Sequence, residues 1–206
     1  TYVRDVPAFR RIVPYLMRTR TESAVYFPQR IEVDGLLAWL EEINAGRPEK
    51  ERVTLFHVLV TAIARALRLR PELNRFIVGR RTYQHDDISI AFIVKTAMAD
   101  DAPETEVRLV FTGLETVEQV RDRVDGAVEH KRATLGGRDD QLVDLFAPAP
   151  RPVLDLVART VAALDYHNAL PSFLREAIPL YTSVYLVNVG SIGIDPPFHH
   201  LYEYGT

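Results

Sequence analysis

Apolar residues recur at intervals of three and four along much of this chain, the spacing of an amphipathic helix. The clearest example runs from Thr54 to Leu69, where Thr54 is suited to the N-cap and Pro71 ends the helix near Arg70. The same spacing predicts further helices over Phe9–Thr19, Gly35–Ile43, about Glu115–Thr134, Val153–Leu164 and Leu170–Ile178.

Other segments have the patterns of β-strands. Residues 25–33 alternate between apolar and polar side chains, which indicates a half-buried strand. Residues 87–97 form a nearly continuous apolar run, suited to a strand that is buried on both faces. Further strands are expected over 75–84 and 106–113, and a last one leads into Gly190.

Helices and strands are mixed in this order without strict alternation, so the pattern predicts an α+β fold with a layered, mixed sheet. A length of 206 residues fits one domain spanning residues 1–206. Residues 136–182 differ in character, because several prolines separate two apolar helical patterns there. We expect this segment to be an insertion between a surface helix and the closing strand.

Composition narrows the possible function. The formal net charge is -3, and no dense basic patch is visible, so nucleic acid is not an expected partner. No apolar run approaches the ~20 residues that span a bilayer. The chain has no cysteine, which excludes thiolate chemistry and fits a reducing cytoplasm.

The closing segment, residues 182–206, is the most promising place for chemistry. Its Gly190–Gly193 element lacks the spacing of a Gly-x-Ser-x-Gly nucleophile elbow, since Ser191 directly follows Gly190. A glycine-lined bend that lets a ligand or another backbone approach is the better interpretation. His199 and His200 are adjacent, so on an extended segment they point to opposite faces, and we expect no metal site there.

The remaining candidates are single residues. His57 lies on the apolar helix and is more typical of a buried structural histidine than of a catalytic one. His85, followed by two aspartates, most resembles a turn, with cation binding as the alternative. A small basic cluster near the N-terminus, which includes Arg10 and Arg11, is either solvated surface or a contact for an anionic ligand.

Several segments, taken in order, resemble the catalytic domain of the dihydrolipoyl acyltransferases of 2-oxo acid dehydrogenase complexes, within the chloramphenicol acetyltransferase-like superfamily. Residues 9–44 are similar to the family's opening helix, first strand and second helix. Residues 53–77 resemble its core helix with the following Pro-x-x-Asn, here Pro71 and Asn74. Residues 87–97 and 186–206 resemble two of its strands, the second with its turn.

The resemblance implies a mixed sheet flanked by helices, assembled as a homotrimer or a higher assembly of trimers. It also implies acyl transfer between coenzyme A and a second acceptor, either a lipoyl-bearing protein or a small molecule. A histidine general base and a hydroxyl that stabilises the oxyanion would perform this reaction. No lipoyl domain is expected within these residues.

The resemblance also suggests site residues. Asn188 and Ser191 match positions near the reacting centre, and Arg10 and Arg11 would lie near the anionic coenzyme. Val187 occupies the family's oxyanion-stabilising Ser/Thr position, and the family's His-x-x-x-Asp-Gly motif is expected beyond Thr206. Two functions therefore remain open: a coenzyme A-dependent acyltransferase, and a non-catalytic binding or scaffolding relative.

Overall fold

The computed structural model describes residues 1–17, 19–95, 104–133, 149–177 and 181–188. Its helices are α1 (Ala8–Leu16), α2 (Arg20–Ser23), α3 (Asp34–Asn44), α4 (Leu55–Leu69), α5 (Val117–Ala133), α7 (Arg151–Tyr166) and α8 (Ser172–Ala177), with two short 3₁₀ helices, η1 (Glu49–Glu51) and η2 (Pro71–Asn74). The strands are β1 (Arg75–Val78), β2 (Arg81–Gln84), β3 (Ile88–Lys95), β4 (Glu104–Phe111) and β5 (Val184–Leu186). All the predicted helices are present.

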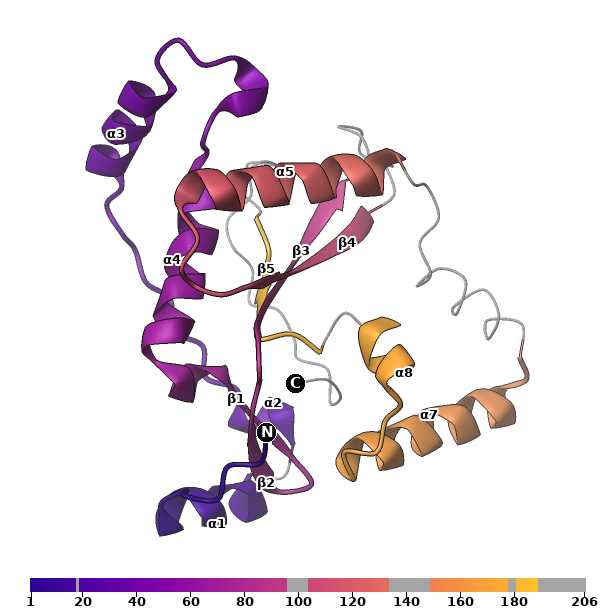
Figure 1. Cartoon of the computed structure of the whole chain (residues 1–206). Coiled ribbons are helices and arrows are strands. Elements are labelled where there is room, and N and C mark those ends of the chain that lie inside the picture. The colour runs from indigo at the N-terminus through magenta and orange to yellow at the C-terminus, as the bar shows by residue number, and fades with distance from the viewer. Residues whose placement is uncertain (18, 96–103, 134–148, 178–180, 189–206) are drawn as a thin grey trace.

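The larger sheet has the strand order β4-β3-β5. β3 and β4 are antiparallel, with Ile90 opposite Leu109, whereas β3 and β5 are parallel, with Ile90 opposite Val184. Figure 1 shows α4 and α5 beside this sheet, with α7 and α8 set apart from them. The predicted α+β fold with a mixed sheet is confirmed.

One face of the sheet builds the core. Ile88, Ile90 and Phe92 alternate along β3, so their side chains share a face, and all three are buried. They pack with buried residues of α4, α5 and β4, namely Val60, Ala64, Leu67, Val107, Phe111, Val120 and Val124. Residues such as Ala91, with its partner Arg108, therefore belong to the opposite face.

The start of α4 is fixed by a reciprocal cap. Thr54 is the N-cap, as predicted, and its hydroxyl accepts the backbone N–H of His57 at 3.4 Å. The imidazole Nδ1 of His57 accepts the Thr54 N–H at 3.1 Å in return. His57 is only 4% exposed, which agrees with its predicted structural role.

The prediction of one strand over 75–84 is wrong, because this segment folds back on itself as the antiparallel β1–β2 hairpin. Gly79 and Arg80 form its turn, both with positive φ (55° and 61°), as in a tight hairpin turn of the I′ type. A Cβ on Gly79 would lie 2.6 Å from the Tyr166 carbonyl oxygen. The turn is thus packed closely against the end of α7.

The predicted strand over 25–33 is also wrong, since residues 24–33 form neither strand nor helix. Alternation alone does not make a strand, because the backbone needs a partner for its hydrogen bonds. Val25, Phe27 and Ile31 are 87%, 81% and 68% exposed. Large apolar side chains of this segment therefore face solvent in the single chain.

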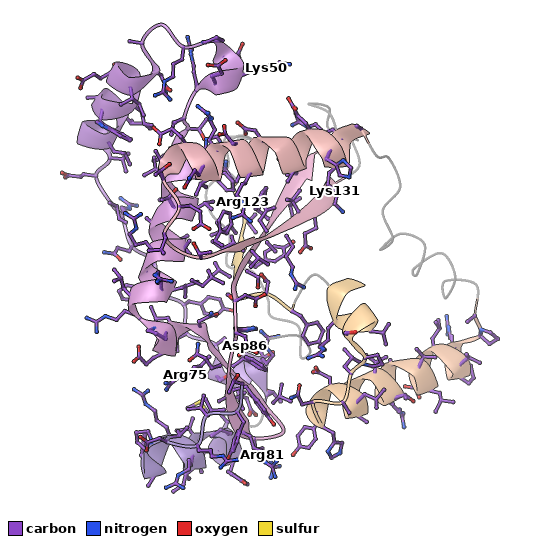
Figure 2. All side chains as sticks on the ribbon, viewed as in Figure 1. Lys50, Arg75, Arg81, Asp86, Arg123 and Lys131 are labelled. Carbon is purple, nitrogen blue, oxygen red and sulfur yellow. The ribbon has the colours of Figure 1, made fainter. Side chains whose placement is uncertain are left out.

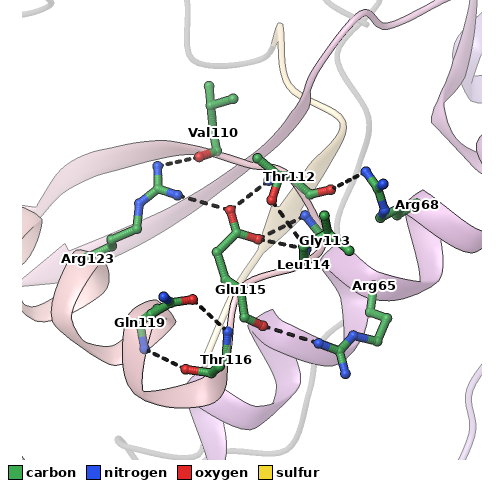
Figure 3. Close-up of polar contacts among 10 residues, drawn as sticks. All are labelled: Arg65, Arg68, Val110, Thr112, Gly113, Leu114, Glu115, Thr116, Gln119 and Arg123. Atoms are coloured by element: carbon green, nitrogen blue, oxygen red, sulfur yellow. Dashed lines mark hydrogen bonds and ion pairs between the residues drawn. The ribbon is translucent and has the colours of Figure 1, made fainter.

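The loop between β4 and α5 is held by one carboxylate (Figure 3). Glu115 accepts the backbone N–H groups of Thr112, Gly113 and Leu114 at 2.7, 2.9 and 3.2 Å. Arg123 donates to the same carboxylate at 3.2 Å. These contacts fix the direction in which α5 leaves the sheet and crosses it.

Candidate functional site

A polar cleft lies between the β1–β2 hairpin, β4, and the segment that joins α7 to α8. Its inner cavity has a volume of about 210 Å³. The polar side chains that line it include His85, Arg108, Asp165, Ser172, Arg175 and Tyr181. An adjoining outer cavity of about 490 Å³ shares Phe76, His85, Asn168 and Arg175 with it. The two cavities therefore adjoin at these four residues, and together they are called the polar cleft below.

His85 stands at the junction of the two cavities. Its ring packs against Phe76, with ring centroids 4.4 Å apart. Burial lowers the pKa of His85 below its usual 6.5, so the imidazole is neutral near pH 7. Among the described residues, no hydrogen bond engages this ring. A neutral imidazole with an open nitrogen in a cavity can accept a proton or a hydrogen bond.

Asn74 holds His85 in place. Its backbone carbonyl accepts the His85 N–H at 3.0 Å and the Gln84 side-chain amide at 2.9 Å. Its own side-chain Nδ2 donates to the Asp87 carbonyl at 2.9 Å. Asn74 thus ties the end of η2 to both ends of the short loop between β2 and β3, which gives the Pro-x-x-Asn pattern of the sequence a structural reason.

Two arginines bring positive charge to the cleft from separate elements. Arg108 extends from β4 on the face of the sheet opposite the core, and Arg175 comes from α8. A guanidinium nitrogen of Arg108 donates to the Arg175 backbone carbonyl at 3.5 Å. This hydrogen bond uses the backbone carbonyl of Arg175, so the guanidinium group of Arg175 takes no part in it.

Tyr181 and Asp165 line the inner cavity and contact each other. The Tyr181 hydroxyl donates to Asp165 Oδ1 at 2.5 Å. Burial, with this hydrogen bond, raises the pKa of Tyr181 well above its usual value, so the phenol stays protonated. The pair joins the residues before β5 to the last turn of α7, and it occupies one oxygen of the Asp165 carboxylate.

The residues singled out in the sequence lie elsewhere. Asn188 and Val187 directly follow β5, and both are exposed. Ser191 is outside the described residues, as are Gly190, His199 and His200. Arg10 and Arg11 are exposed on α1, which packs against β2. The described structure therefore places Asn188 and the arginine pair on separate elements.

Sequence reasoning missed the polar cleft because its parts are distant along the chain. His85 was interpreted as part of a turn, and Arg108 was not singled out. The alternation of the strand was the signal that could have found it. Arg108 stands between the apolar residues Val107 and Leu109, so its side chain must lie on the face opposite theirs. Nothing local marks Arg175 or Tyr181 as its neighbours.

Comparison with known families gives a partial match. The matching model is described as 2-oxoacid dehydrogenases acyltransferase (catalytic domain). Residues 7–99 match this family. The predicted relation to the acyltransferase catalytic domain is thus confirmed over α1 to β3, which includes Asn74 and His85. Arg108 and Arg175 lie beyond the acyltransferase match.

A solved structure supports the fold. The chain is similar to the crystal structure of a probable dihydrolipoamide acetyltransferase from Listeria monocytogenes 4b F2365, with a TM-score of 0.53 and 12% identity, covering 100% of this chain and 71% of that chain. At this identity the likeness concerns the fold. A comparison with curated proteins finds no match.

Two further features of the described residues concern metal ions and membranes. Within the described ranges, no three His, Asp or Glu side chains come together as a metal ion would need. No helix in those ranges combines the length and apolar character needed to cross a membrane.

Proposed function

We propose that this chain is an acyltransferase domain that transfers an acyl group between coenzyme A and a thiol or hydroxyl acceptor. The observation that carries the proposal is the match of residues 7–99 to the acyltransferase catalytic domain. The mixed β4-β3-β5 sheet and the similarity to an acetyltransferase structure support it. The acceptor is a lipoyl-bearing protein or a small molecule.

In this proposal the reacting centre lies after β5. Asn188 and Ser191 are its polar groups, and they would donate hydrogen bonds to the oxyanion that forms when the acceptor attacks the thioester carbonyl. One such donor contributes roughly 10²- to 10³-fold in rate. A histidine base beyond Thr206 completes the set, taking the acceptor proton. Arg10 and Arg11, exposed on α1, are proposed contacts for the phosphates of coenzyme A.

We further propose a homotrimer or an assembly of trimers, in the cytoplasm. The exposed apolar side chains of residues 24–33 support this, because Val25 and Phe27 are over four-fifths exposed in the single chain. Phe9 and Leu16 on α1 add to the same kind of surface, at 75% and 70% exposure. Burial of these residues against neighbouring copies would remove them from water.

Thioester transfer by the full-length protein tests the activity. The protein is incubated with acetyl-coenzyme A and dihydrolipoamide, and release of free coenzyme A is followed. Release that depends on both substrates supports the proposal, whereas no release above the uncatalysed rate, with other acyl donors and acceptors also inactive, contradicts it. Light scattering at micromolar concentration tests the assembly, and a monomer contradicts it.

The second candidate is a non-catalytic relative that keeps the fold as a binding or scaffolding module. The observation that favours it is Val187, which has no donor at the position of the family's hydroxyl and is 54% exposed. A trimer that binds coenzyme A or an acyl acceptor without turnover would favour this candidate. A monomer without turnover would favour neither.

A further inference from the structure

We propose that the polar cleft is a binding site for a small anion with carboxylate or phosphate oxygens, held by Arg108 and Arg175 and contacted by His85. Asn188 of the proposed reacting centre is not among the residues that line the cleft, and the proposal does not depend on acyl transfer. The reasons are the charges of the inner cavity and the open imidazole.

The inner cavity carries a surplus of positive charge. Arg108 and Arg175 contribute two permanent charges, against one carboxylate, that of Asp165. Tyr181 already donates to Asp165. Among the described residues, neither arginine forms an ion pair with an acidic side chain. Guanidinium groups recognise carboxylate and phosphate with paired N–H donors, so an anion of this kind is the ligand that their chemistry fits.

The inner cavity, where both arginines lie, has room for a small group only. A volume of about 210 Å³ is below the roughly 300 to 1,000 Å³ of pockets for drug-sized ligands. Ser172 offers a hydroxyl, and His85 a neutral ring, to any polar group that the anion carries beside its charge. Leu170 and Phe76 supply apolar wall for a short carbon skeleton.

The outer cavity carries charges of both signs. Asp86 and Asp87 line it, on the loop that carries His85, and so does Arg175. The ammonium group of Thr1, which also lines it, lies 3.3 Å from Asp86 Oδ1. Figure 2 shows Asp86 beside the hairpin, where Arg75 and Arg81 are also labelled. Arg75 is engaged with Gln84 at 3.1 Å and does not line either cavity.

Calorimetric titration of the full chain with inorganic phosphate and, separately, with acetate tests the proposal at constant ionic strength. We expect saturable binding of at least one probe, and about tenfold weaker binding in Arg108→Ala and Arg175→Ala, since each removes a charged hydrogen-bond donor. Binding of phosphate alone indicates phosphate compounds, acetate alone indicates carboxylates, and both indicate their shared oxygens. No saturable binding of either probe overturns the proposal.

Arg151→Ala is the matched control. It removes the same charge from the exposed start of α7, outside both cavities, and should leave the affinity unchanged. An equal loss in this variant means that the anion binds by general charge, and this overturns the site. Arg108→Lys and Arg175→Lys serve if an alanine variant does not fold. Each keeps the positive charge, so its affinity for the anion should lie between those of the wild type and the alanine variant.

A spectroscopic readout separates binding from stability. The imidazole signals of His85 should shift in NMR spectra when phosphate or acetate is added, and His85→Gln should remove that signal. An unmoved His85 signal at saturation contradicts the site. Acyl transfer is assayed in the wild type and in the same variants. Absence of anion binding by the wild type with normal acyl transfer contradicts the cleft site but not the proposed function. Absence of acyl transfer by the wild type with intact anion binding contradicts the proposed function but not the cleft site.

Discussion

The imidazole Nε2 of His57 on α4 lies 3.2 Å from the carboxylate Oδ1 of Asp125 on α5. Because Nδ1 accepts the Thr54 N–H, the proton of the neutral ring is on Nε2, which donates it to Asp125. One side chain thus caps its own helix and joins it to the next. The two helices that cover the sheet are linked by this contact as well as by their apolar packing.

This arrangement predicts a pH-dependent stability. Burial lowers the pKa of His57 in the folded protein, although Asp125 opposes the shift. The unfolded chain therefore binds a proton more readily than the folded one, between the depressed pKa and the ordinary 6.5. The stability that His57 contributes is present above about pH 6.5 and is lost as the pH falls below it.

Urea unfolding from about pH 5 to 8 measures this dependence. His57→Gln is the control, because glutamine at this position of the cap can still accept the Thr54 N–H but does not titrate. The slope of the unfolding free energy against pH should be smaller in His57→Gln than in the wild type. Equal slopes would show that His57 does not set the dependence.

Gly113→Ala is expected to destabilise the protein by at least about 2 kcal/mol. Gly113 has φ of 75°, and an added Cβ would lie 2.7 Å from the Ala64 carbonyl oxygen and from the Arg68 Cβ. Gly126→Ala is the matched change inside α5, where the Cβ meets nothing within 4 Å. It should stabilise by roughly 0.5 to 1 kcal/mol. Denaturant midpoints of both variants test the contrast, which an equal effect would refute.

Glu115→Gln should lower the free energy of unfolding by about 1.5 to 3 kcal/mol, because a carboxylate that accepts three backbone N–H groups is replaced by an amide with one oxygen. Burial raises the pKa of Glu115, but these hydrogen bonds outweigh it and lower the pKa below the usual 4.5. Its contribution is thus present above about pH 4.5 and declines in more acidic solution.

Glu118→Gln is the control for this variant. Glu118 lies 4.0 Å from Arg47 in an exposed pair, and its loss should cost less than about 1 kcal/mol. Unfolding in guanidinium chloride at pH 7 compares the two. A loss in Glu118→Gln as large as that in Glu115→Gln would mean that net charge, and not the Thr112–Leu114 amides, is responsible.

In the proposed function, Val187→Ser should raise the rate of acyl transfer by the full-length protein, since it introduces a hydroxyl at the position proposed for the oxyanion donor. The expected gain is up to about 10²-fold, the lower end of what one oxyanion donor contributes. Turnover with acetyl-coenzyme A measures it, with Val187→Ala as the control without a donor. An unchanged rate in Val187→Ser would place oxyanion stabilisation on other residues.

The sequence pattern predicted correctly the elements that are determined by residues within one short segment. The helix over 54–69 has its cap, its apolar stripe and its terminating proline within one stretch, and the structure has α4 at Leu55–Leu69. The two wrong predictions concern pairing. The residues of 25–33 do not indicate whether a partner strand is available to pair with them. The hairpin turn within 75–84 requires positive φ angles at Gly79 and Arg80, which the alternating pattern does not predict.

The polar cleft could not be predicted for a related reason. Its lining residues are brought together by the antiparallel β3–β4 pairing and by the packing of the hairpin turn on Tyr166. Both are long-range contacts. The sequence did predict that His57 is structural, because an apolar helix face surrounds it. It gave no comparable sign that His85 would face a cavity.

The parallel pairing of β5 with β3 means that the larger sheet can form completely only late in synthesis of the chain. Ser89 and Ser183 are hydrogen bonded across 94 residues, so β3 gains its second neighbour only after α5, α7 and α8 have been synthesised. Until then one edge of β3 offers open backbone groups to any passing strand. Contacts between distant residues also close slowly. One edge of β3 is therefore unpaired until β5 has been synthesised, and we expect misassembly at that stage to limit the yield of folded protein.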